Sequence, residues 1–457
     1  MKKKVKIFSL LTPLVMSSCN IYTQFKTKSD VPENFFGNID STLVATNDTA
    51  SIGAMPWNDI FKDTKLQALI EEGLANNTDL ASAQLRVEEA EATLRTAKLA
   101  LLPSFALAPQ GNVSSFDGGK ATQTYSLPVT ASWEIDVFGR MRNARKQAKA
   151  LYSQSQDYKQ AVRSQLISSI SNSYYTLLML DEQLRISRET KESWAETVRA
   201  TEALMEAGLA NETAVSQMRA ALSGINVSIM DLEEQINQME NTMAQLLSTT
   251  PRHIDRNRLD EQVMPDVINV GVPLDLLHRR PDVRAAERKV EQTFYAVNQA
   301  RSSFYPQIVL SGSAGWTNSA GGIVQNPAKF LATAIGSITQ PLFARGQLIG
   351  QLQIAKAQQE EATLAFQQTL LNAGIEVNDA LKQCQTARQK ADEYEAQIAS
   401  LRKAYDSTRL LMDYGTTTYL EVLTAQQNLL SAQLSQTANR FSEIQSIITL
   451  FHALGGN

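Results

Sequence analysis

The stretch Val162–Leu177 reads VRSQLISSISNSYYTL and shows the pattern that decides the fold. Its apolar residues recur at intervals of three and four, which places them on one face of an α-helix: Val162, Leu166, Ile170, Tyr174 and Leu177. No proline occurs from Val129 to Thr250, so a helix can run through most of this block without a break. Residues that favour helix, chiefly Ala, Gln, Leu, Glu, Lys and Arg, are abundant in it.

A second proline-free block covers residues 342–457 and repeats the pattern at Phe366, Leu370, Val377, Leu381 and Cys384. Each block has one glycine near a break in the pattern, Gly208 in the first and Gly415 in the second. We interpret both glycines as the tips of helical hairpins. The first arm, from about Arg140 to Ala207, would be about 100 Å long at 1.5 Å per residue. A helix of that length has to pack along other helices, as in a coiled coil.

Short segments of alternating apolar residues precede each block. In residues 103–136, Phe105 and Leu107 alternate with other residues, and so do Tyr125, Leu127 and Val129. The run from Asp117 to Lys120, Asp-Gly-Gly-Lys, is a good hairpin turn between them. Residues 306–341 repeat this texture around Gly321-Gly322. The sequence therefore predicts two β-hairpins, whose strands have the length of tilted membrane strands.

The N-terminus has the pattern of an export signal. Lys2, Lys3, Lys4 and Lys6 precede a short apolar stretch that ends in Met16-Ser17-Ser18-Cys19. This ending resembles a lipoprotein box, in which the cysteine is acylated and becomes the mature N-terminus, so Cys19 is the predicted lipidation site. The alternative is a plain secretory signal that contains a cysteine. Cys384 is the one other cysteine, and its helical spacing with Leu381 and Val377 predicts a packing role.

The two halves share landmarks at a nearly constant separation, such as Pro103 with Pro306 and Gly208 with Gly415. We therefore expect a duplicated unit of helix, β-hairpin and long helical hairpin. The expected division is a signal peptide at 1–18, a lipid-anchored segment at 19–64, a first repeat at 65–250, a linker at 251–282 and a second repeat at 283–457. Within the repeats, the β-hairpins are expected at 103–136 and 306–341, and the long helical hairpins at 140–248 and 346–455.

Charge and motif content exclude several classes of function. The chain has a net charge of −4, which becomes −8 without the four N-terminal lysines, and this argues against nucleic-acid partners. The three histidines are far apart, and the chain has no His-Glu-x-x-His, phosphate loop or Gly-x-Ser-x-Gly motif. We therefore expect no catalytic residues, no cofactor and no metal site. The methionines Met205, Met218, Met239 and Met243 are interpreted as helix packing rather than as copper ligands.

The strands predict an assembly of several chains. Beyond the signal, no run of about 18 or more apolar residues is available for a membrane helix. Four strands are too few to close a barrel in lipid, so the barrel has to be shared between chains. The predicted fold is mainly α, with long coiled-coil hairpins and four strands per chain that contribute to a small membrane β-barrel.

Residues 273–287 read PLDLLHRRPDVRAAE and resemble the linker signature of a known family, through Leu277, Arg279, Arg280, Pro281, Asp282 and Val283. The family is the TolC superfamily of outer-membrane factors, in its lipoprotein branch similar to OprM and CusC. The resemblance implies a lipid-anchored homotrimer in the outer membrane that extends into the periplasm. It also implies a periplasmic adaptor and an inner-membrane resistance-nodulation-division transporter as partners. The implied function is a passive exit duct for drugs or other small solutes.

The resemblance also suggests roles for single residues. For the signature itself we favour a structural role at the crossover between the halves, with Pro281 and Asp282 starting a helix. The hairpin tips are candidate adaptor-docking surfaces: Ala207, Gly208, Leu209, Ala210, Gly415, Thr416 and Thr417. Glu421 is the candidate gate residue, because a ring of three copies would favour cations and divalent ions. Thr424 stands where the family often has aspartate, and an ordinary solvated helix glutamate remains an alternative for Glu421.

A pore-free periplasmic coiled-coil adaptor or scaffold is the alternative from another class. Long helical hairpins alone would permit it. The four alternating segments and the duplication favour the channel, because an adaptor would be expected to carry a single hairpin between globular domains.

Overall fold

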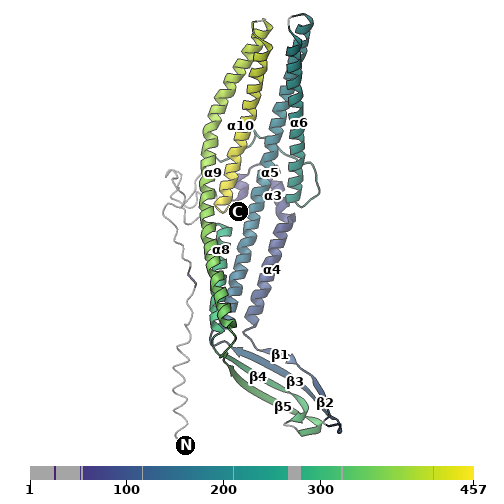
Figure 1. The fold of residues 1–457 in the computed structure, drawn as a ribbon, viewed down its shortest axis with the longest axis vertical. Coiled ribbons are helices and arrows are strands. Elements are labelled where there is room, and N and C mark those ends of the chain that lie inside the picture. Colours follow the sequence, from purple (N-terminus) through teal and green to yellow (C-terminus); the bar gives the residue numbers. More distant parts are fainter. Residues whose placement is uncertain are drawn as a thin grey trace. The chain divides into compact units, whose positions relative to one another are not determined.

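The computed structural model describes residues 25–26, 52, 55–115, 117–208, 210–265, 279–320, 323–414 and 416–456 (Figure 1). The chain divides into two compact units. Unit 1 comprises Met1–Asp30, Leu85–Asp157 and Arg284–Gln368, and unit 2 comprises Val31–Gln84, Tyr158–Val283 and Thr369–Asn457. The predicted signal peptide and the predicted functional residues Cys19, Leu209, Leu277 and Gly415 lie outside the described residues.

The described chain is mainly helical, and its helices recur in matching lengths. Two short helices, α2 (Trp57–Ile60) and α3 (Thr64–Asn76), precede the first set. Helices α4 (Thr78–Leu99) and α8 (Pro281–Ser302) have 22 residues each, α5 (Arg140–Glu206) and α9 (Gln347–Asp413) have 67, and α6 (Glu212–Leu246) and α10 (Tyr419–Ala453) have 35. The two halves of the sequence therefore build helices of equal length. None of the helices described here is both long enough and apolar enough to cross a membrane.

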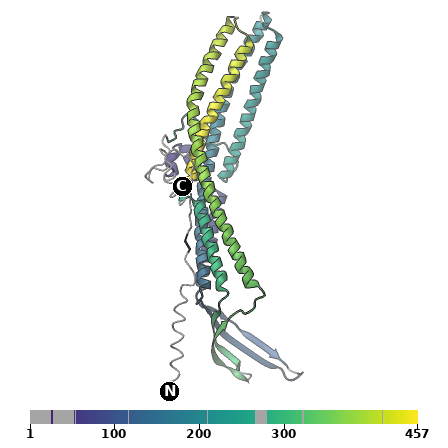
Figure 2. The same cartoon turned by 60° about the vertical axis from the view of Figure 1, so that its left-hand side comes forward.

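The strands form one antiparallel sheet in unit 1 (Figure 2). They are β1 (Ser104–Leu107), β2 (Gln110–Ser114), β3 (Thr122–Ile135), β4 (Gln307–Ala320) and β5 (Ile323–Thr339). The order is β1-β3-β4-β5, and β2 also pairs with β3. Pairing of β3 with β4 joins the two predicted hairpins, with Leu127 opposite Trp316 and Trp133 opposite Leu310.

The sheet has five strands where four were expected. The first expected strand is interrupted at Ala108–Pro109, between β1 and β2. Proline has no amide hydrogen to donate to the ladder, which explains the break. The expected turn is present, with positive φ at Asp117 (54°) and Gly118 (70°). Two successive residues with positive φ form the tight turn that a β-hairpin favours.

Large apolar side chains of the sheet are exposed in the single chain. Examples from different strands are Phe105 (72% exposed), Trp316 (58%) and Ile338 (72%). Large apolar side chains exposed on several paired strands are typical of a surface that lipid or another protein covers.

The core of unit 2 is built around buried aromatic residues of α5 and α10. Tyr174 and Tyr175 pack edge to face, and Phe61 packs edge to face on Phe451. Asp63 caps α3 and accepts hydrogen bonds from Tyr174 Oη (2.7 Å), Gln262 Nε2 (2.9 Å) and Asn257 Nδ2 (3.0 Å). Burial raises the pKa of Tyr174, which therefore stays protonated as a donor. This network fixes the segment before α3 and the segment after α6 against α5.

Two packing predictions are confirmed in unit 2. Cys384 is 2% exposed within the main apolar cluster, and burial raises the pKa of its thiol. Of the four methionines, Met218 and Met243 are buried in apolar clusters and Met239 packs partly buried against the main one, whereas Met205 is half-buried and its packing role stays a prediction.

Candidate functional site

The tip of the first hairpin connects α5 and α6 at one end of unit 2. Gly208 has φ = 75°, and the amide of Ala210 donates to the carbonyl of Leu204 at 3.2 Å. A positive φ followed by this bond ends the helix in the manner that favours glycine. The side chain of Asn211 then caps α6 by accepting from the amide of Ala214 at 2.9 Å. Ala207 and Gly208 are exposed, so small, uncharged residues form the turn itself, and exposed Glu206 and Glu212 flank it.

The tip of the second hairpin lies beside the first (Figures 1 and 2). The amide and the hydroxyl of Thr416 both donate to the carbonyl of Leu411 at 2.9 Å. Thr416 is exposed and Thr417 is half-buried. Near the tips, Tyr419 Oη of α10 donates to Gln217 Oε1 of α6 at 2.9 Å, which links the two hairpins directly.

Glu421 lies in the first turn of α10 and is exposed. Its carboxylate accepts a hydrogen bond from the hydroxyl of Thr417. An acidic side chain in the first turn also interacts favourably with the helix dipole. The hydroxyl of Thr424 donates to the carbonyl of Leu420 at 2.8 Å, so it is hydrogen-bonded within α10. Glu421 is therefore the charged group of this turn of α10.

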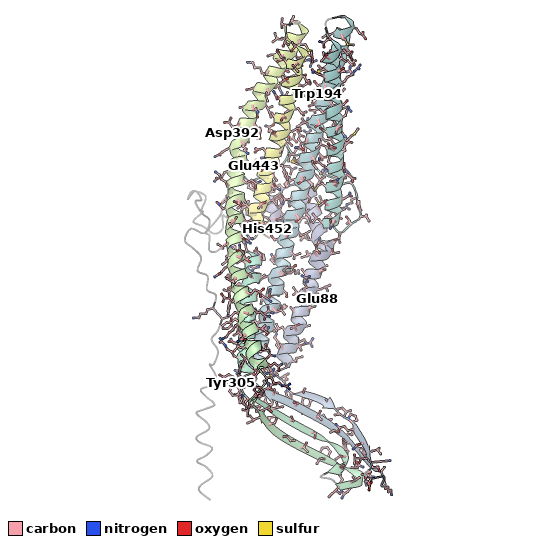
Figure 3. The ribbon with its side chains drawn as sticks, viewed as in Figure 1. Glu88, Trp194, Tyr305, Asp392, Glu443 and His452 are labelled. Carbon is pink, nitrogen blue, oxygen red and sulfur yellow. The ribbon has the colours of Figure 1, made fainter. Side chains whose placement is uncertain are left out.

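Behind the tips, an apolar cluster joins the two hairpins. Trp194 and Val198 of α5 pack with Met218 and Ile225 of α6 and with Leu423 of α10. Figure 3 places Trp194 in the part of unit 2 that carries the tips. The packing fixes α10 against the first hairpin over its first turns.

A polar contact accompanies this cluster. Gln426 of α10 is 4% exposed, and its Nε2 donates to Ser193 Oγ of α5 at 2.9 Å and to Tyr405 Oη of α9 at 3.3 Å. Gln426 Oε1 and Trp194 Nε1 are buried without a hydrogen-bond partner among the described residues. Sequence reasoning missed this contact. A tryptophan within a helix rich in small residues was the one available signal.

The signature segment lies at the other end of α10. Pro281 is the first residue of α8, and Asp282 Oδ1 accepts from the amide of Val283 at 2.9 Å, as expected for a helix start. Arg280 is 6% exposed and binds Asp282 through Nε (3.1 Å) and Nη2 (2.8 Å). Its Nη1 donates to Glu376 Oε2 (2.8 Å) and to the carbonyl of Ala453 (2.9 Å). Arg280 therefore links the start of α8, the middle of α9 and the end of α10.

His452 belongs to the same region and is labelled in Figure 3. Its Nδ1 lies 3.1 Å from Ser164 Oγ, which donates to the carbonyl of Gly456 at 2.8 Å. Burial lowers the pKa of His452, and Arg280 adds to the shift, whereas Glu376 and Asp282 oppose it. Val283 is buried as well, at 4% exposure. Arg280, Asp282 and Val283 of the signature are thus part of a packed junction.

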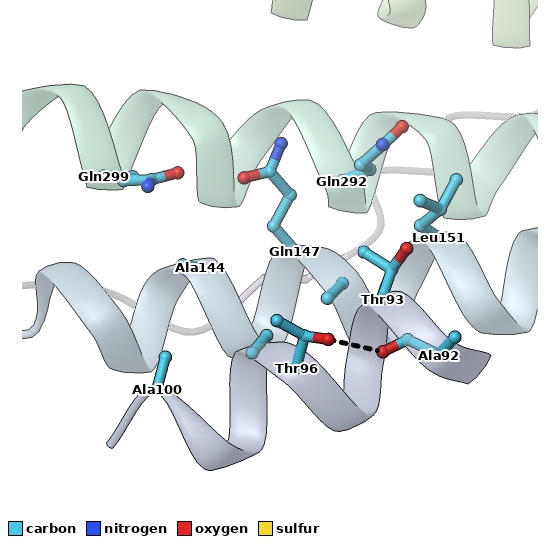
Figure 4. A pocket seen from close by; sticks show the side chains of 11 residues that line it. Ala92, Thr93, Thr96, Ala100, Ala144, Gln147, Leu151, Gln292 and Gln299 are labelled. Atoms are coloured by element: carbon cyan, nitrogen blue, oxygen red, sulfur yellow. Dashed lines mark hydrogen bonds between the residues drawn. The ribbon is translucent and has the colours of Figure 1, made fainter. Parts of the chain in front are cut away.

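Unit 1 contains an open groove between α4, α5 and α8 (Figure 4), with a volume of about 560 Å³. Gln147 of α5 lies between Gln292 and Gln299 of α8, and Leu151 with several alanine and threonine side chains completes the lining. None of the eleven lining residues is charged. The groove can therefore hold water or a neutral polar group. Among the residues that the structure describes, no group of three His, Cys, Asp or Glu side chains is placed to hold a metal ion.

These features define a class of protein with paired long helical hairpins and an exposed apolar sheet. The sequence model of the family described as "Outer membrane efflux protein" matches residues 69–249 and 272–456. The chain belongs to this family. It is an efflux channel protein of the outer membrane, and the family supports the channel over the pore-free adaptor.

Relatives and solved structures agree with this assignment. The chain is 26% identical over 455 residues to the cation efflux system protein CusC of Escherichia coli, covering 99% of this chain and 98% of CusC. It is 27% identical to the probable outer membrane lipoprotein SilC of Salmonella typhimurium, covering 99% of both chains. It is 28% identical over 415 residues to the probable efflux pump outer membrane protein TtgC of Pseudomonas putida, covering 88% of this chain and 84% of TtgC.

Among solved structures, the outer-membrane channel OprN superposes with a TM-score of 0.86 at 25% identity, covering 95% of this chain and 99% of OprN. The MtrE outer membrane channel of Neisseria gonorrhoeae, solved in its open state, gives a TM-score of 0.85 at 25% identity. This superposition covers 96% of this chain and 98% of MtrE. The TolC-like fold expected from the sequence is therefore confirmed at the level of the chain.

Proposed function

We propose that three copies of the chain close their sheets into one membrane barrel and their long hairpins into one periplasmic tunnel. The exposed sheet of unit 1 carries this proposal. Its outer strands, β1 with β2 on one side and β5 on the other, are edges in the single chain. Unpaired edges and exposed apolar side chains are costly in water, and open edges are not tolerated in lipid. Pairing of β5 with the first strands of the next copy satisfies both edges.

The test is the mass of the detergent-solubilised protein by native mass spectrometry, followed by conductance in planar bilayers. We expect a trimer that opens aqueous pores. A monomer that inserts without conductance would refute the shared barrel.

The proposed partners are a periplasmic adaptor at the hairpin tips and, through it, an inner-membrane resistance-nodulation-division transporter. The small side chains of Ala207, Gly208 and Thr416 are exposed, and Ala210 beside them is half-buried, which supports tip docking. The remaining residues of the proposed surface follow from the sequence: Leu209, Gly415 and Thr417. Such small side chains permit close packing between helices.

Thr416→Asp tests docking, because it introduces a charge at the tip. Thr408 is the control, since it is a half-buried threonine of the same arm, away from the tip, and its hydroxyl donates to its own helix at 2.7 Å. We expect Thr416→Asp to abolish crosslinking to the adaptor and Thr408→Asp to leave it intact, with both proteins assembled. Equal crosslinking of the two variants would contradict docking at the tips.

The cargo is proposed to be a range of small solutes selected mainly by the transporter. The names of the relatives include cation, antibiotic and solvent efflux proteins, and their identities to this chain lie between 25% and 28%. Sequence identity to these relatives therefore does not indicate which class of cargo this chain exports. Exchanging the transporter of a reconstituted pump should change the exported compounds, whereas exchanging the channel should not.

Glu421 is proposed as the gate residue. Three copies near the threefold axis would form a ring of like charge, which attracts cations and divalent ions. In single-channel recordings, Glu421→Gln should lower cation preference and divalent block. Glu212 lies in the first turn of α6 and is exposed, so Glu212→Gln is the matched control and should change neither property. Indistinguishable currents from both variants and the parent would assign Glu421 to helix capping alone.

Acylation of Cys19 is proposed as the lipid attachment. The relative SilC is named as a probable outer membrane lipoprotein, which supports it. Two or more acyl chains are needed for stable anchoring. Intact-mass spectrometry of the mature protein should show acyl mass on a chain that begins at Cys19, and an unmodified chain with another start would exclude it.

A further inference from the structure

The two faces of the sheet in unit 1 differ in character. Successive residues of a strand point to opposite faces, and the register of the ladders shows which residues share a face. The aromatic residues of the strands all lie on one face: Phe105, Tyr125, Trp133, Trp316 and Phe330. The other face carries many hydroxyl side chains, and Ser313 Oγ and Thr333 Oγ1 lie 2.7 Å apart on it. One aromatic face and one hydroxyl face are the pattern of a wall between lipid and water.

Charge is rare in the strands and is confined to the hydroxyl face. Among the residues of the five strands, the charged ones are Glu134 of β3 and Lys329 of β5. Glu134 follows Trp133 and Lys329 precedes Phe330, so both point away from the aromatic face. The carboxylate of Glu134 accepts from Arg140 Nε at 3.1 Å and from Nη2 at 2.5 Å, which neutralises it. Lys329 is exposed and forms no ion pair with any residue that the structure describes.

Lys329 lies at the level of an aromatic pair on the opposite face. It is paired with Thr317 of β4, and the next pair of the same ladder is Trp316 with Phe330. These two rings pack edge to face with their centres 5.6 Å apart. Aromatic rings gather where a membrane barrel passes from lipid to water, so this pair marks an interface level on the lipid side. The turn between β4 and β5 follows close by in the sequence, so Lys329 lies near that end of the sheet.

We propose that Lys329 tunes the ion preference of the duct: three copies form a ring of positive charge on the water-filled side of the shared barrel, and this ring favours anions. The inference rests on the shared barrel proposed above. Rings of lysine or arginine line pores that select anions. The ring acts oppositely to the proposed ring of Glu421, which attracts cations.

The dimensions of the barrel set the size of the effect. Strands β1 and β2 both pair with β3, so each chain supplies four strand positions and three copies supply twelve. Twelve strands about 4.8 Å apart and tilted by about 40° give a backbone radius of about 12 Å. At about 0.1 M salt, an ion on the axis is then about one Debye length from each lysine, so the ring is screened in part. We expect a preference of about twofold, and a larger one at about 0.01 M, where the Debye length is about 30 Å.

Reversal potentials across a planar bilayer in a gradient of potassium chloride test the ring. They give the permeability ratio of potassium to chloride for the inserted trimer. Lys329→Gln should raise this ratio about twofold and Lys329→Glu about fourfold, because the second substitution changes the ring by twice the charge. Glu421→Gln should lower the ratio, so the two rings have effects of opposite sign.

Lys120→Gln is the matched control. Lys120 is an exposed lysine of the turn between β2 and β3, at the same end of the sheet but outside the strands. Its removal deletes the same charge and should change the ratio little. Equal ratios in the parent and in Lys329→Gln would overturn the ring, and so would equal changes in Lys329→Gln and Lys120→Gln.

Thiol labelling in lipid vesicles tests the face directly. Cys384 is buried, so the parent protein gives the background. A charged thiol reagent that does not cross lipid should modify Lys329→Cys and leave Phe330→Cys unmodified, because the first position faces water and the second faces lipid. Modification of Phe330→Cys alone would place Lys329 on the lipid side, against the phosphates of lipid headgroups, and would overturn the ring.

The measurements separate the ring from the barrel on which it rests. A protein that inserts without conductance would refute the shared barrel and the ring together. A conducting trimer whose ratio is unchanged in Lys329→Gln would overturn the ring alone. A lysine on an edge strand can also discourage unwanted strand pairing, and that role would change the yield of trimer in Lys329→Gln but not the ratio.

Discussion

Replacing Arg280 by alanine tests whether the signature segment stabilises the junction of unit 2. The variant removes a buried guanidinium that binds two carboxylates and the carbonyl of Ala453. Burial alone would raise the pKa of Asp282, but the hydrogen bonds and charge of Arg280 outweigh it and hold that pKa below its usual value. Without Arg280, Asp282 and Glu376 become like charges without a common cation, and the end of α10 loses a donor.

The size of the effect follows from the burial of the partners. Removing one member of a buried ion pair costs about 3–5 kcal/mol. The side chains of Asp282 and Glu376 are 43% and 34% exposed, so water screens part of the penalty and about 2–3 kcal/mol remains. Arg258 is the matched control, because it pairs with Asp260 at the same sequence spacing and 3.0 Å, but both side chains are more than half exposed. Arg258→Ala should cost less than about 1 kcal/mol.

Hydrogen exchange measured by mass spectrometry reports this energy locally. The amides of Leu454, Gly455 and Gly456 donate to carbonyls of the last turns of α10. A loss of 2–3 kcal/mol accelerates their exchange about 30- to 150-fold if the junction opens locally. We expect this increase in Arg280→Ala and not in Arg258→Ala. Similar exchange at these amides in the two variants would refute the argument that Arg280 holds the end of α10.

Three further predictions concern unit 2. The folded-state pKa of His452 is lowered, so neutral His452 stabilises the fold above its usual pKa of about 6.5, and this stabilisation is lost as the pH falls below that value. His452→Gln should therefore flatten the decrease of the melting temperature between about pH 7.5 and 5.5. A decrease as steep as in the parent would contradict this. Gly208→Ala should destabilise by about 1 kcal/mol, because φ is positive, whereas Gly224→Ala within α6 should stabilise slightly, and thermal melting distinguishes the two signs. Gln426→Ala should cost about 1–2 kcal/mol by the same assay, and an unchanged melting temperature would exclude a stabilising contact between the hairpins.

The long helices could be predicted because their signals are local. The first arm was expected from Arg140 to Ala207, and α5 runs from Arg140 to Glu206. Each signal can be identified from a short stretch of sequence: the absence of proline, the spacing of apolar residues and one glycine at the tip. Pro109 is visible in the sequence too, but the alternation of apolar residues on either side of it predicts one continuous strand, whereas the structure has two.

The contacts between helices could not be predicted in the same way. Gln426 meets Ser193 across 233 positions, and Arg280 meets Glu376 across 96. Each of these contacts depends on how one helix is rotated about its axis and shifted along it relative to its neighbour. The spacing of apolar residues determines neither the rotation nor the shift. Among the candidate site residues, Ala207, Gly208 and Thr416 are exposed, and their role in docking stays a prediction. The contact of Glu421 with Thr417 follows only from the geometry of the turn.

Equal helix lengths and unequal helix ends bear on where the proposed gate would move. One extra residue would rotate the rest of a helix by about 100° and raise it by 1.5 Å, which would disturb every contact along a shared helical wall. The two halves keep lengths of 67 and 35 residues in their long hairpins, so both can take equivalent places in the proposed wall. Their ends are free to differ. Asn211 caps α6 with its side chain, whereas Thr418 makes no such bond at the start of α10, and the carboxylate of Glu421 accepts from Thr417 instead. A helix start without its own side-chain cap is the more easily rearranged of the two, which favours the second hairpin as the moving part of the proposed gate.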